Sequence, residues 1–204
     1  MSPATFIALA AACAPNIHPQ TLHSVVQQES GYNVFAIGIN KAPRLKSQPK
    51  TREEAVAIAT RLMSQNVNFD AGLAQINIKN LNWLSMSVDD LFDPCKNLKA
   101  SSLVLSDCYR RASLQYGKGQ QALRAALSCY NTGNFNRGFA SGYVRNVVAQ
   151  AQTYVPAVSA EPDPVPNTTS VAEEALPAAK PRGGDAFSTP EPDAFEKEKA
   201  SRFQ

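Results

Sequence analysis

The sequence predicts a mainly helical α+β domain with a small extended or β insertion, followed by a disordered tail. Apolar residues recur at helical spacing in several segments, and short segments rich in β-branched residues and glycine lie between them. The composition also changes along the chain. Residues 1–155 carry 15 Lys and Arg against 8 Asp and Glu, whereas residues 156–204 carry 5 against 9 and hold 8 of the 14 prolines. We therefore expect a folded domain at 1–155 with net charge +7, and a Pro-rich, acidic tail at 156–204 with net charge −4.

The first apolar run of the chain extends from Phe6 to Ala14. It is well short of the roughly 18–20 residues that span a bilayer as a helix, so no transmembrane segment is expected. A signal-peptide core is the alternative interpretation, but no Lys or Arg precedes the run, as such a signal requires. We therefore expect a first core helix here and find no convincing signal peptide in this chain.

Three further elements are predicted before residue 66. Residues 19–28 fit an amphipathic helix, because apolar residues recur at i, i+3 and i+4: Leu22, Val25 and Val26. Residues 34–40 are short and partly β-branched, which favours a strand. Thr51 and Glu54 match a capping box, which predicts a helix at about 52–65. The apolar face of that helix comprises Val56, Ala59, Leu62 and Met63.

The remaining elements alternate between an extended insertion and helices. Residues 68–78 alternate loosely in polarity and contain Gly72, so an extended segment is expected there rather than a helix. Helices are predicted at 98–114, 122–130 and 143–154. The apolar positions that predict the first of these are Leu98, Leu103, Leu105 and Tyr109.

Four cysteines lie in the expected domain: Cys13, Cys95, Cys108 and Cys129. Their spacing fits no CxxC or Cys/His zinc pattern, and neither a metal nor another cofactor is expected. An even number of cysteines in a modest domain indicates two disulfides and an oxidising compartment, with three possible pairings. Four buried, reduced cysteines are the alternative.

Glu29 is the candidate catalytic residue. It follows the apolar-faced helix at 19–28 and precedes Ser30 and Gly31. The negative end of the helix dipole and adjacent apolar surface both disfavour ionisation, so they raise the pKa of its carboxyl above the usual value of about 4.3. A carboxylic acid that stays protonated near neutral pH is what general acid catalysis requires. A solvated glutamate at a helix end is the alternative interpretation.

Two other segments carry polar groups that suit a sugar ligand. The segment Gly72-Leu73-Ala74-Gln75-Ile76-Asn77 supplies two amides, which can donate and accept hydrogen bonds at once. The segment Tyr130-Asn131-Thr132-Gly133 ends a predicted helix with a phenol and an amide beside a glycine turn. A phenol in that position could bond the catalytic carboxyl or its substrate. Both segments follow Glu29 in the sequence, and their order and spacing form a specific pattern.

Together, Glu29-Ser30 and these two segments resemble the three motifs of the family-1, soluble lytic type transglycosylases. The resemblance is closer still to the lytic transglycosylase subunit of VirB-type type IV secretion systems. The stretches that carry this closer resemblance are Cys13-Ala14-Pro15, Ala36-Ile37-Gly38, Phe92-Asp93-Pro94-Cys95-Lys96-Asn97-Leu98 and Cys108-Tyr109-Arg110-Arg111. The resemblance covers about residues 3–155 and does not extend to the tail.

The resemblance implies a lysozyme-like fold and a lytic transglycosylase that uses one carboxylate. Glu29 would protonate the bond between N-acetylmuramic acid and N-acetylglucosamine in peptidoglycan and then act as base, so that the sugar closes as the 1,6-anhydro product. Ser30 would also fix the helix end, and Tyr130 would orient Glu29 or the N-acetyl group. The substrate-binding residues implied by the resemblance are Ser30, Gln75, Asn77, Tyr130 and Asn131. Gly38 departs from the family, which often has a serine-containing loop at this position.

Two other functions remain open at this point. Asp70 is the one acidic residue in the extended insertion, and it could be a second catalytic carboxylate or a loop aspartate that caps a turn. In the first case a hydrolytic muramidase would describe the protein better. A non-catalytic wall-binding scaffold that recruits secretion components is the other alternative. Trp83 is a residue of the core or the rim, or a surface on which a sugar ring stacks.

The expected partners follow from the charge and the resemblance. The basic residues of the domain are scattered and no nucleic-acid motif is present, so no nucleic acid is expected. Attraction to the anionic cell wall is the simpler use of the positive charge. We expect peptidoglycan strands as the substrate and a periplasmic location. Other type IV secretion components are the expected partners, and the tail is a candidate for contacting them.

Overall fold

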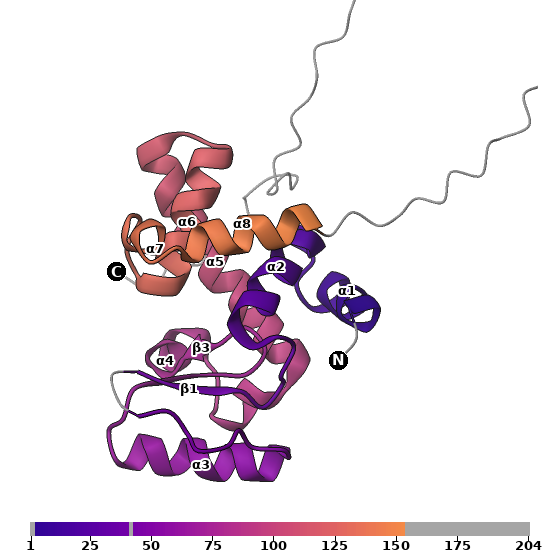
Figure 1. The fold of residues 1–204 in the computed structure, drawn as a ribbon, viewed down its shortest axis with the longest axis vertical. Helices are drawn as coiled ribbons and strands as arrows, with labels where there is room; N and C mark the ends of the chain where they lie inside the picture. The colour runs from indigo at the N-terminus through magenta and orange to yellow at the C-terminus, as the bar shows by residue number, and fades with distance from the viewer. Residues whose placement is uncertain (1–2, 41–42, 154–204) are drawn as a thin grey trace, which may run out of the picture.

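A computed structural model describes residues 3–40 and 43–153 of the chain, and the predicted tail at 156–204 lies outside them. The architecture is α+β and mainly helical, with a small three-stranded sheet, as the sequence predicts. Helices gather on one side of the molecule and the sheet lies with α3 on the other (Figure 1). The helices are α1 (Pro3–Cys13), α2 (Pro19–Ser30), α3 (Arg52–Ser64), α4 (Leu81–Leu84), α5 (Pro94–Tyr116), α6 (Gln120–Thr132), α7 (Arg137–Ala140) and α8 (Tyr143–Thr153).

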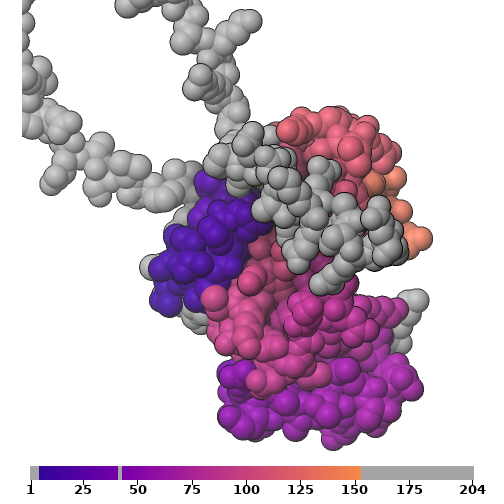
Figure 2. Space-filling view, turned by 180° about the vertical axis from the view of Figure 1, so that it is seen from behind, coloured from indigo at the N-terminus to yellow at the C-terminus, as the bar shows by residue number. Residues whose placement is uncertain are grey.

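The helical lobe is built around α5, which packs against α1 and α6, while α2 packs against α1 and α8. Phe6 and Ala10 of α1 are buried in the core, so the first apolar run is a core helix. No helix among the described residues is both long and apolar enough to cross a membrane. Viewed from behind, the indigo surface of the N-terminal helices lies above the violet surface of the lobe that contains the sheet (Figure 2).

Helix α2 continues two residues beyond the predicted segment, to Ser30. Gly31 ends it in the left-handed conformation, with φ +56°, and its N–H donates to the carbonyl of Gln27. Such a glycine at the end of a helix satisfies a carbonyl that would otherwise have no partner. Glu29 is therefore held in the last turn of a rigid helix.

The sheet is antiparallel in the order β1 (Ile37–Ile39), β2 (Phe69–Ala71) and β3 (Ile76–Asn77). The predicted strand at 34–40 is thus shorter than expected, and the extended segment at 68–78 forms two strands joined by a turn. Phe69 and Ala71 are fully buried, whereas Asp70 between them is only partly buried. This alternation directs the core face of β2 inward and leaves Asp70 on the other face.

The capping residue predicted for α3 is confirmed, because the hydroxyl of Thr51 accepts from the backbone N–H of Glu54. The carboxylate of Glu54 accepts from the N–H of Lys50, one residue before the cap. The apolar face is partly wrong. Met63 is 38% exposed, and Ala55 takes its place among the buried residues, because α3 packs inward through its Ala55–Ala59–Leu62 side.

Both disulfides expected from the cysteine count are present, and the structure gives their pairing. Cys13–Cys95 joins the end of α1 to the start of α5, and Cys108–Cys129 joins α5 to α6. Helix α5 begins four residues earlier than predicted, at Pro94, because the carboxylate of Asp93 caps it by accepting from the N–H of Lys96. The two bridges therefore tie the long helix to both of its neighbours.

Candidate active site

A cleft of about 660 Å³ opens between the sheet and the helical lobe. Its walls come from the end of α2, strands β2 and β3, helix α4, the middle of α5 and the end of α6. All three segments singled out in the sequence contribute to it, through Glu29, through Gln75 and Asn77, and through Tyr130 and Asn131. Segments about 45–55 residues apart in sequence thus line one cavity.

Glu29 presents its carboxyl group to this cleft from the last turn of α2. The pKa of the carboxyl is raised from 4.5 to about 7, mainly by desolvation on burial and also by the negative charge of Asp70. A hydrogen bond from Tyr143 acts in the opposite direction. At neutral pH a substantial fraction of Glu29 therefore carries its proton, as a general acid requires.

Tyr143 is the phenol that contacts Glu29. Its Oη donates to Glu29 Oε1 at 2.6 Å, and its side chain is buried at the start of α8. The sequence places Tyr143 only in the last predicted helix, and it predicts Tyr130 as a phenol that bonds either the carboxyl or the substrate. The two residues of the observed bond are 114 positions apart. No local pattern indicates such a contact.

We predict that Tyr143→Phe raises the pKa of Glu29 above 7, by about one unit, because it removes a hydrogen bond that favours the charged carboxylate. The titration of the carboxyl carbon by NMR in protein labelled at Glu measures this shift. Tyr116→Phe is the matched control, since Tyr116 packs against Phe135 at the end of α5 and should leave the titration unchanged. A pKa of Glu29 that stays the same or falls in Tyr143→Phe would contradict the assignment of this bond.

The side chain of Asn97 in α5 bonds the turn between β2 and β3. The Asn97 side chain is fully buried; its Oδ1 accepts from the N–H of Ala74 at 2.8 Å, and its Nδ2 donates to the carbonyls of Ala71 and Leu91. Gly72 lies directly on this amide with φ +81°, and a Cβ there would lie 2.2 Å from Asn97 Nδ2. Asn97 lies in the stretch Phe92–Leu98 that carries the family resemblance, but the sequence predicts no role for it.

The same turn is fastened to two more helices by residues of the predicted site. Ser30 donates its hydroxyl to the carbonyl of Leu73 at 2.7 Å, which ties the end of α2 to the turn. Tyr130 donates to the carbonyl of Ala74 at 2.7 Å, and its oxygen also lies 3.0 Å from the hydroxyl of Ser101. Ser30 and Tyr130 thus hold the turn in place, and neither hydroxyl bonds Glu29.

The side-chain amide of Gln75 lies beside Gly38. Gln75 has φ +48°, and its side-chain amide donates to the carbonyls of Ala36 and Gly72 at 3.1 and 2.9 Å. A Cβ at Gly38 would lie 2.8 Å from Gln75 Oε1. A side chain at position 38 would therefore displace the amide of Gln75.

Asp70 and Asn77 are cross-strand neighbours that both line the cleft. Asn77 Nδ2 donates to Asp70 Oδ1 at 2.7 Å, and Asn40 Nδ2 donates to Asp70 Oδ2 at 2.8 Å. Burial raises the pKa of Asp70, and the two amide donors lower it. Asp70 does not cap a turn, because it lies in β2 and the described bonds of its carboxylate go to side-chain amides.

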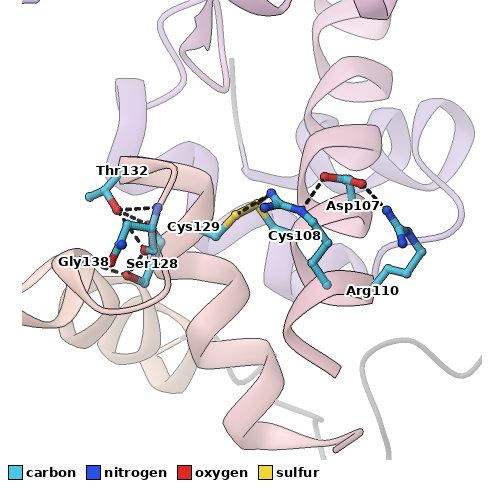
Figure 3. The surroundings of a disulfide bond; sticks show 9 residues. Asp107, Cys108, Arg110, Ser128, Cys129, Thr132 and Gly138 are labelled. Atoms are coloured by element: carbon cyan, nitrogen blue, oxygen red, sulfur yellow. Dashed lines mark hydrogen bonds and ion pairs between the residues drawn. A yellow bond between two sulfur atoms is a disulfide. The ribbon is translucent and has the colours of Figure 1, made fainter. Parts of the chain in front are cut away.

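The cleft is also lined by exposed and basic groups. Asn131 is exposed, and Trp83 is 53% exposed with its indole N–H donating to Asn80. Trp83 is thus a rim residue whose ring is open to the cleft. The Cys108–Cys129 disulfide forms part of the wall, with the ion pair of Asp107 and Arg110 beside it (Figure 3).

Arg111 lines the cleft beside the Cys108–Cys129 disulfide. Its Nε pairs with Asp107 at 2.9 Å, a terminal nitrogen lies 3.1 Å from the sulfur of Cys129, and its guanidinium sits 5.8 Å from the ring centre of Phe135. Within residues 3–40 and 43–153, no cluster of three or more His, Cys, Asp or Glu side chains is arranged to hold a metal ion.

Comparison with known proteins agrees with this arrangement. The family model "Transglycosylase SLT domain" matches residues 6–152, which include every residue of the cleft named above. No solved structure matches the chain significantly.

Among curated proteins, the type IV secretion system protein virB1 of Brucella suis is 41% identical over 88% of this chain and 78% of its own length. The corresponding protein of Brucella abortus is 42% identical over 85% of this chain and 77% of its own length. Protein virB1 of Agrobacterium fabrum is 34% identical over 79% and 65%. The chain therefore belongs to the transglycosylase SLT domain family, and it is a lysozyme-like lytic transglycosylase of peptidoglycan.

Proposed function

We propose that Glu29 alone supplies the acid and base chemistry by which this enzyme cleaves the β-1,4 bond between N-acetylmuramic acid and N-acetylglucosamine. The observation that carries the proposal is the carboxyl of Glu29 itself, which lies in the cleft with a pKa raised to about 7. A group with this pKa can give up a proton and take one back within a single turnover near neutral pH.

In the first step, protonated Glu29 donates to the glycosidic oxygen, and the bond from that oxygen to C1 of the muramic acid breaks. The N-acetyl oxygen of the substrate stabilises the cationic C1, as the resemblance to the family implies. In the second step, the Glu29 carboxylate takes the proton of the C6 hydroxyl while O6 bonds to C1. The proton lost in the first step is thereby restored, no water is consumed, and the product is the 1,6-anhydro sugar.

Five residues are proposed to position the substrate or the catalytic turn. Asn77, Asn131 and the exposed face of Gln75 line the cleft and can bond hydroxyl and N-acetyl groups. Ser30 and Tyr130 act mainly through the turn at 72–75, because their hydroxyls bond its carbonyls.

The biological setting is proposed from the relatives. Relatives of this chain are named as type IV secretion system proteins, so we propose that the enzyme opens the wall locally for such a machine, in the periplasm. Two disulfides in the domain suit an oxidising compartment. The tail at 156–204 is proposed to link or contact other components of that machine.

Product analysis in H₂¹⁸O tests the reaction. Purified sacculi are digested by the wild-type protein, and released muropeptides are measured by mass spectrometry. We expect anhydro-muropeptides without ¹⁸O, because no water enters the bond. Reducing ends that carry ¹⁸O would instead make the protein a hydrolytic muramidase, and an absence of any released product would favour the wall-binding scaffold.

A further inference from the structure

We propose that Asp70 is the electrostatic partner of Glu29: two amide donors hold it in the wall of the cleft, it forms no bond to the sugar, and its negative charge stabilises the cationic sugar. This inference rests on the proposed function of Glu29. It assigns a role to a second carboxylate in a reaction that needs only one proton donor.

The register of the sheet places Asp70 in the wall of the cleft. Gly38, Asp70 and Asn77 are neighbours across the three strands, so they share one face, while Phe69 and Ala71 face the core. Gly38 has no side chain to cover the carboxylate on one side. Asp70 and Asn77 both line the cavity that contains Glu29. A central strand of a sheet fixes such a side chain more firmly than a loop does.

The hydrogen bonds of Asp70 favour its ionised form and oppose the effect of burial, which raises the pKa of the carboxyl. Each carboxylate oxygen accepts one amide N–H, from Asn77 at 2.7 Å and from Asn40 at 2.8 Å. Among the described residues no Lys, Arg or His forms an ion pair with Asp70, so its charge is not cancelled there by a direct contact. Amide donors favour the charged form of a carboxyl without neutralising its field. A charge held in this way still acts on other groups in the cleft.

The surroundings of Glu29 and Asp70 differ, so they favour different protonation states of the two carboxyls. Glu29 receives one hydrogen bond, from the phenol of Tyr143, whereas Asp70 receives two from amides. The raised pKa of Glu29 includes a contribution from the charge of Asp70. Two carboxyls whose environments differ in this manner take different roles, one as the acid and one as a fixed anion.

The other charged or titratable groups of the cleft do not replace Asp70. Lys79 lies after β3 on the exposed rim, and Arg111 of α5 is paired with Asp107. Tyr130 of α6 and Tyr143 of α8 have pKa values raised above the usual value for a phenol, so both are neutral at physiological pH. Asp70 is thus the anion whose charge acts on Glu29.

Asp70→Asn tests the proposal in the full-length protein, with a soluble peptidoglycan tetrasaccharide as substrate. We expect kcat to fall about 10- to 100-fold with KM changed less than threefold. The alkaline limb of the pH profile of kcat/KM should move to lower pH, because Glu29 loses the anion that favours its acid form. Asp89→Asn is the matched control, since Asp89 pairs with Arg52 on the surface and does not line the cleft.

Two further variants separate charge from structure. Asp70→Glu keeps the charge and should keep the alkaline limb near its wild-type position. Asn40→Ala removes one amide donor from Asp70, raises the pKa of that carboxyl and should move the acid limb of the profile to higher pH. This second variant also tests the proposal if Asp70→Asn folds poorly, as judged by thermal melting.

The failure of this inference is distinct from that of the proposed function. A folded Asp70→Asn with kcat within twofold of the wild type and an unchanged alkaline limb would overturn the role of Asp70, while an inactive Glu29→Gln would still support Glu29. An active Glu29→Gln would overturn the proposed function itself.

Discussion

Glu29→Gln should reduce the release of anhydro-muropeptides from sacculi at least about 10³-fold, to the background of the assay. Glutamine keeps the shape of the side chain and can still accept the bond from Tyr143, but it has no proton to give to the glycosidic oxygen. Mass spectrometry of the digest measures the loss. Wall binding should persist, because the amides and Trp83 that line the cleft are untouched.

The same substitution should stabilise the fold, in a manner that depends on pH. Because the pKa of Glu29 is raised in the folded state, from 4.5 to about 7, the folded protein favours its protonated form. That contribution to stability is fully present below about pH 4.5 and is lost as the pH rises through 7. Glutamine is neutral at every pH. Glu29→Gln should therefore match the wild type at pH 4 and exceed it by about 2–3 kcal/mol at pH 8.5.

Thermal or urea unfolding at the two pH values checks this result. Glu53→Gln is the control, since Glu53 lies exposed on the first turn of α3 and its pKa is lowered rather than raised. It should give no gain at pH 8.5. A Glu29→Gln variant that is destabilised equally at both pH values would show that the carboxyl is not desolvated, and retained cleavage would exclude Glu29 as the acid.

Much of the fold and part of the site could be predicted because the signals were local. The apolar spacing of α2, the cap at Thr51 and the glycine turns at Gly72 and Gly133 are each visible within a few residues. The motifs that contain Glu29, Gln75 and Tyr130 were likewise contiguous, and they do line one cleft.

The contacts that complete the site could not be predicted, because they join distant segments. Tyr143 looks like any residue at the start of an amphipathic helix until α8 packs on α2 and brings its hydroxyl to Glu29. Nothing in the local sequence distinguishes Asn97 from other residues in the first turns of α5. In the structure it is the buried group that bonds the turn at Ala74. The pairing of Cys13 with Cys95 depends on the packing of α1 against α5, which no spacing reveals.

Helix faces were predicted less well than helices. Met63 was expected to face inward because the apolar spacing places it beside Ala59 and Leu62, but the buried side of α3 is formed by Ala55, Ala59 and Leu62. Hydrophobicity alone does not say which side of a broad apolar stripe finds a partner.

Gly72→Ala should destabilise the protein by about 3–4 kcal/mol and lower its Tm by about 10 °C. A Cβ at this position would lie 2.1 Å from the carbonyl oxygen of Leu91 and 2.2 Å from Asn97 Nδ2. Both atoms are buried parts of a bonded network, so neither can yield without breaking the bond between them. The backbone there has φ +81°, which adds the strain of a left-handed conformation for alanine.

Gly117→Ala separates the two causes. Gly117 has φ +73°, close to that of Gly72, but nothing lies within 4 Å of a Cβ placed on it. It should therefore show the conformational cost alone, about 1 kcal/mol. The difference between the two variants in urea unfolding measures the steric clash at Gly72, and equal losses would show that Asn97 and Leu91 move aside freely.

Activity should distinguish the two glycines even more strongly than stability. If the turn at 72–75 shifts to admit a methyl group, Ala74 and Gln75 move with it, and the bonds that Tyr130 and Ser30 make to this turn are strained. Displacements of about 1 Å near a reacting bond cost on the order of 100-fold in rate. Folded Gly72→Ala, assayed well below its Tm, should therefore cleave sacculi about 100-fold more slowly than Gly117→Ala. Equal rates would mean that the network through Asn97 holds the fold together but does not position the cleft.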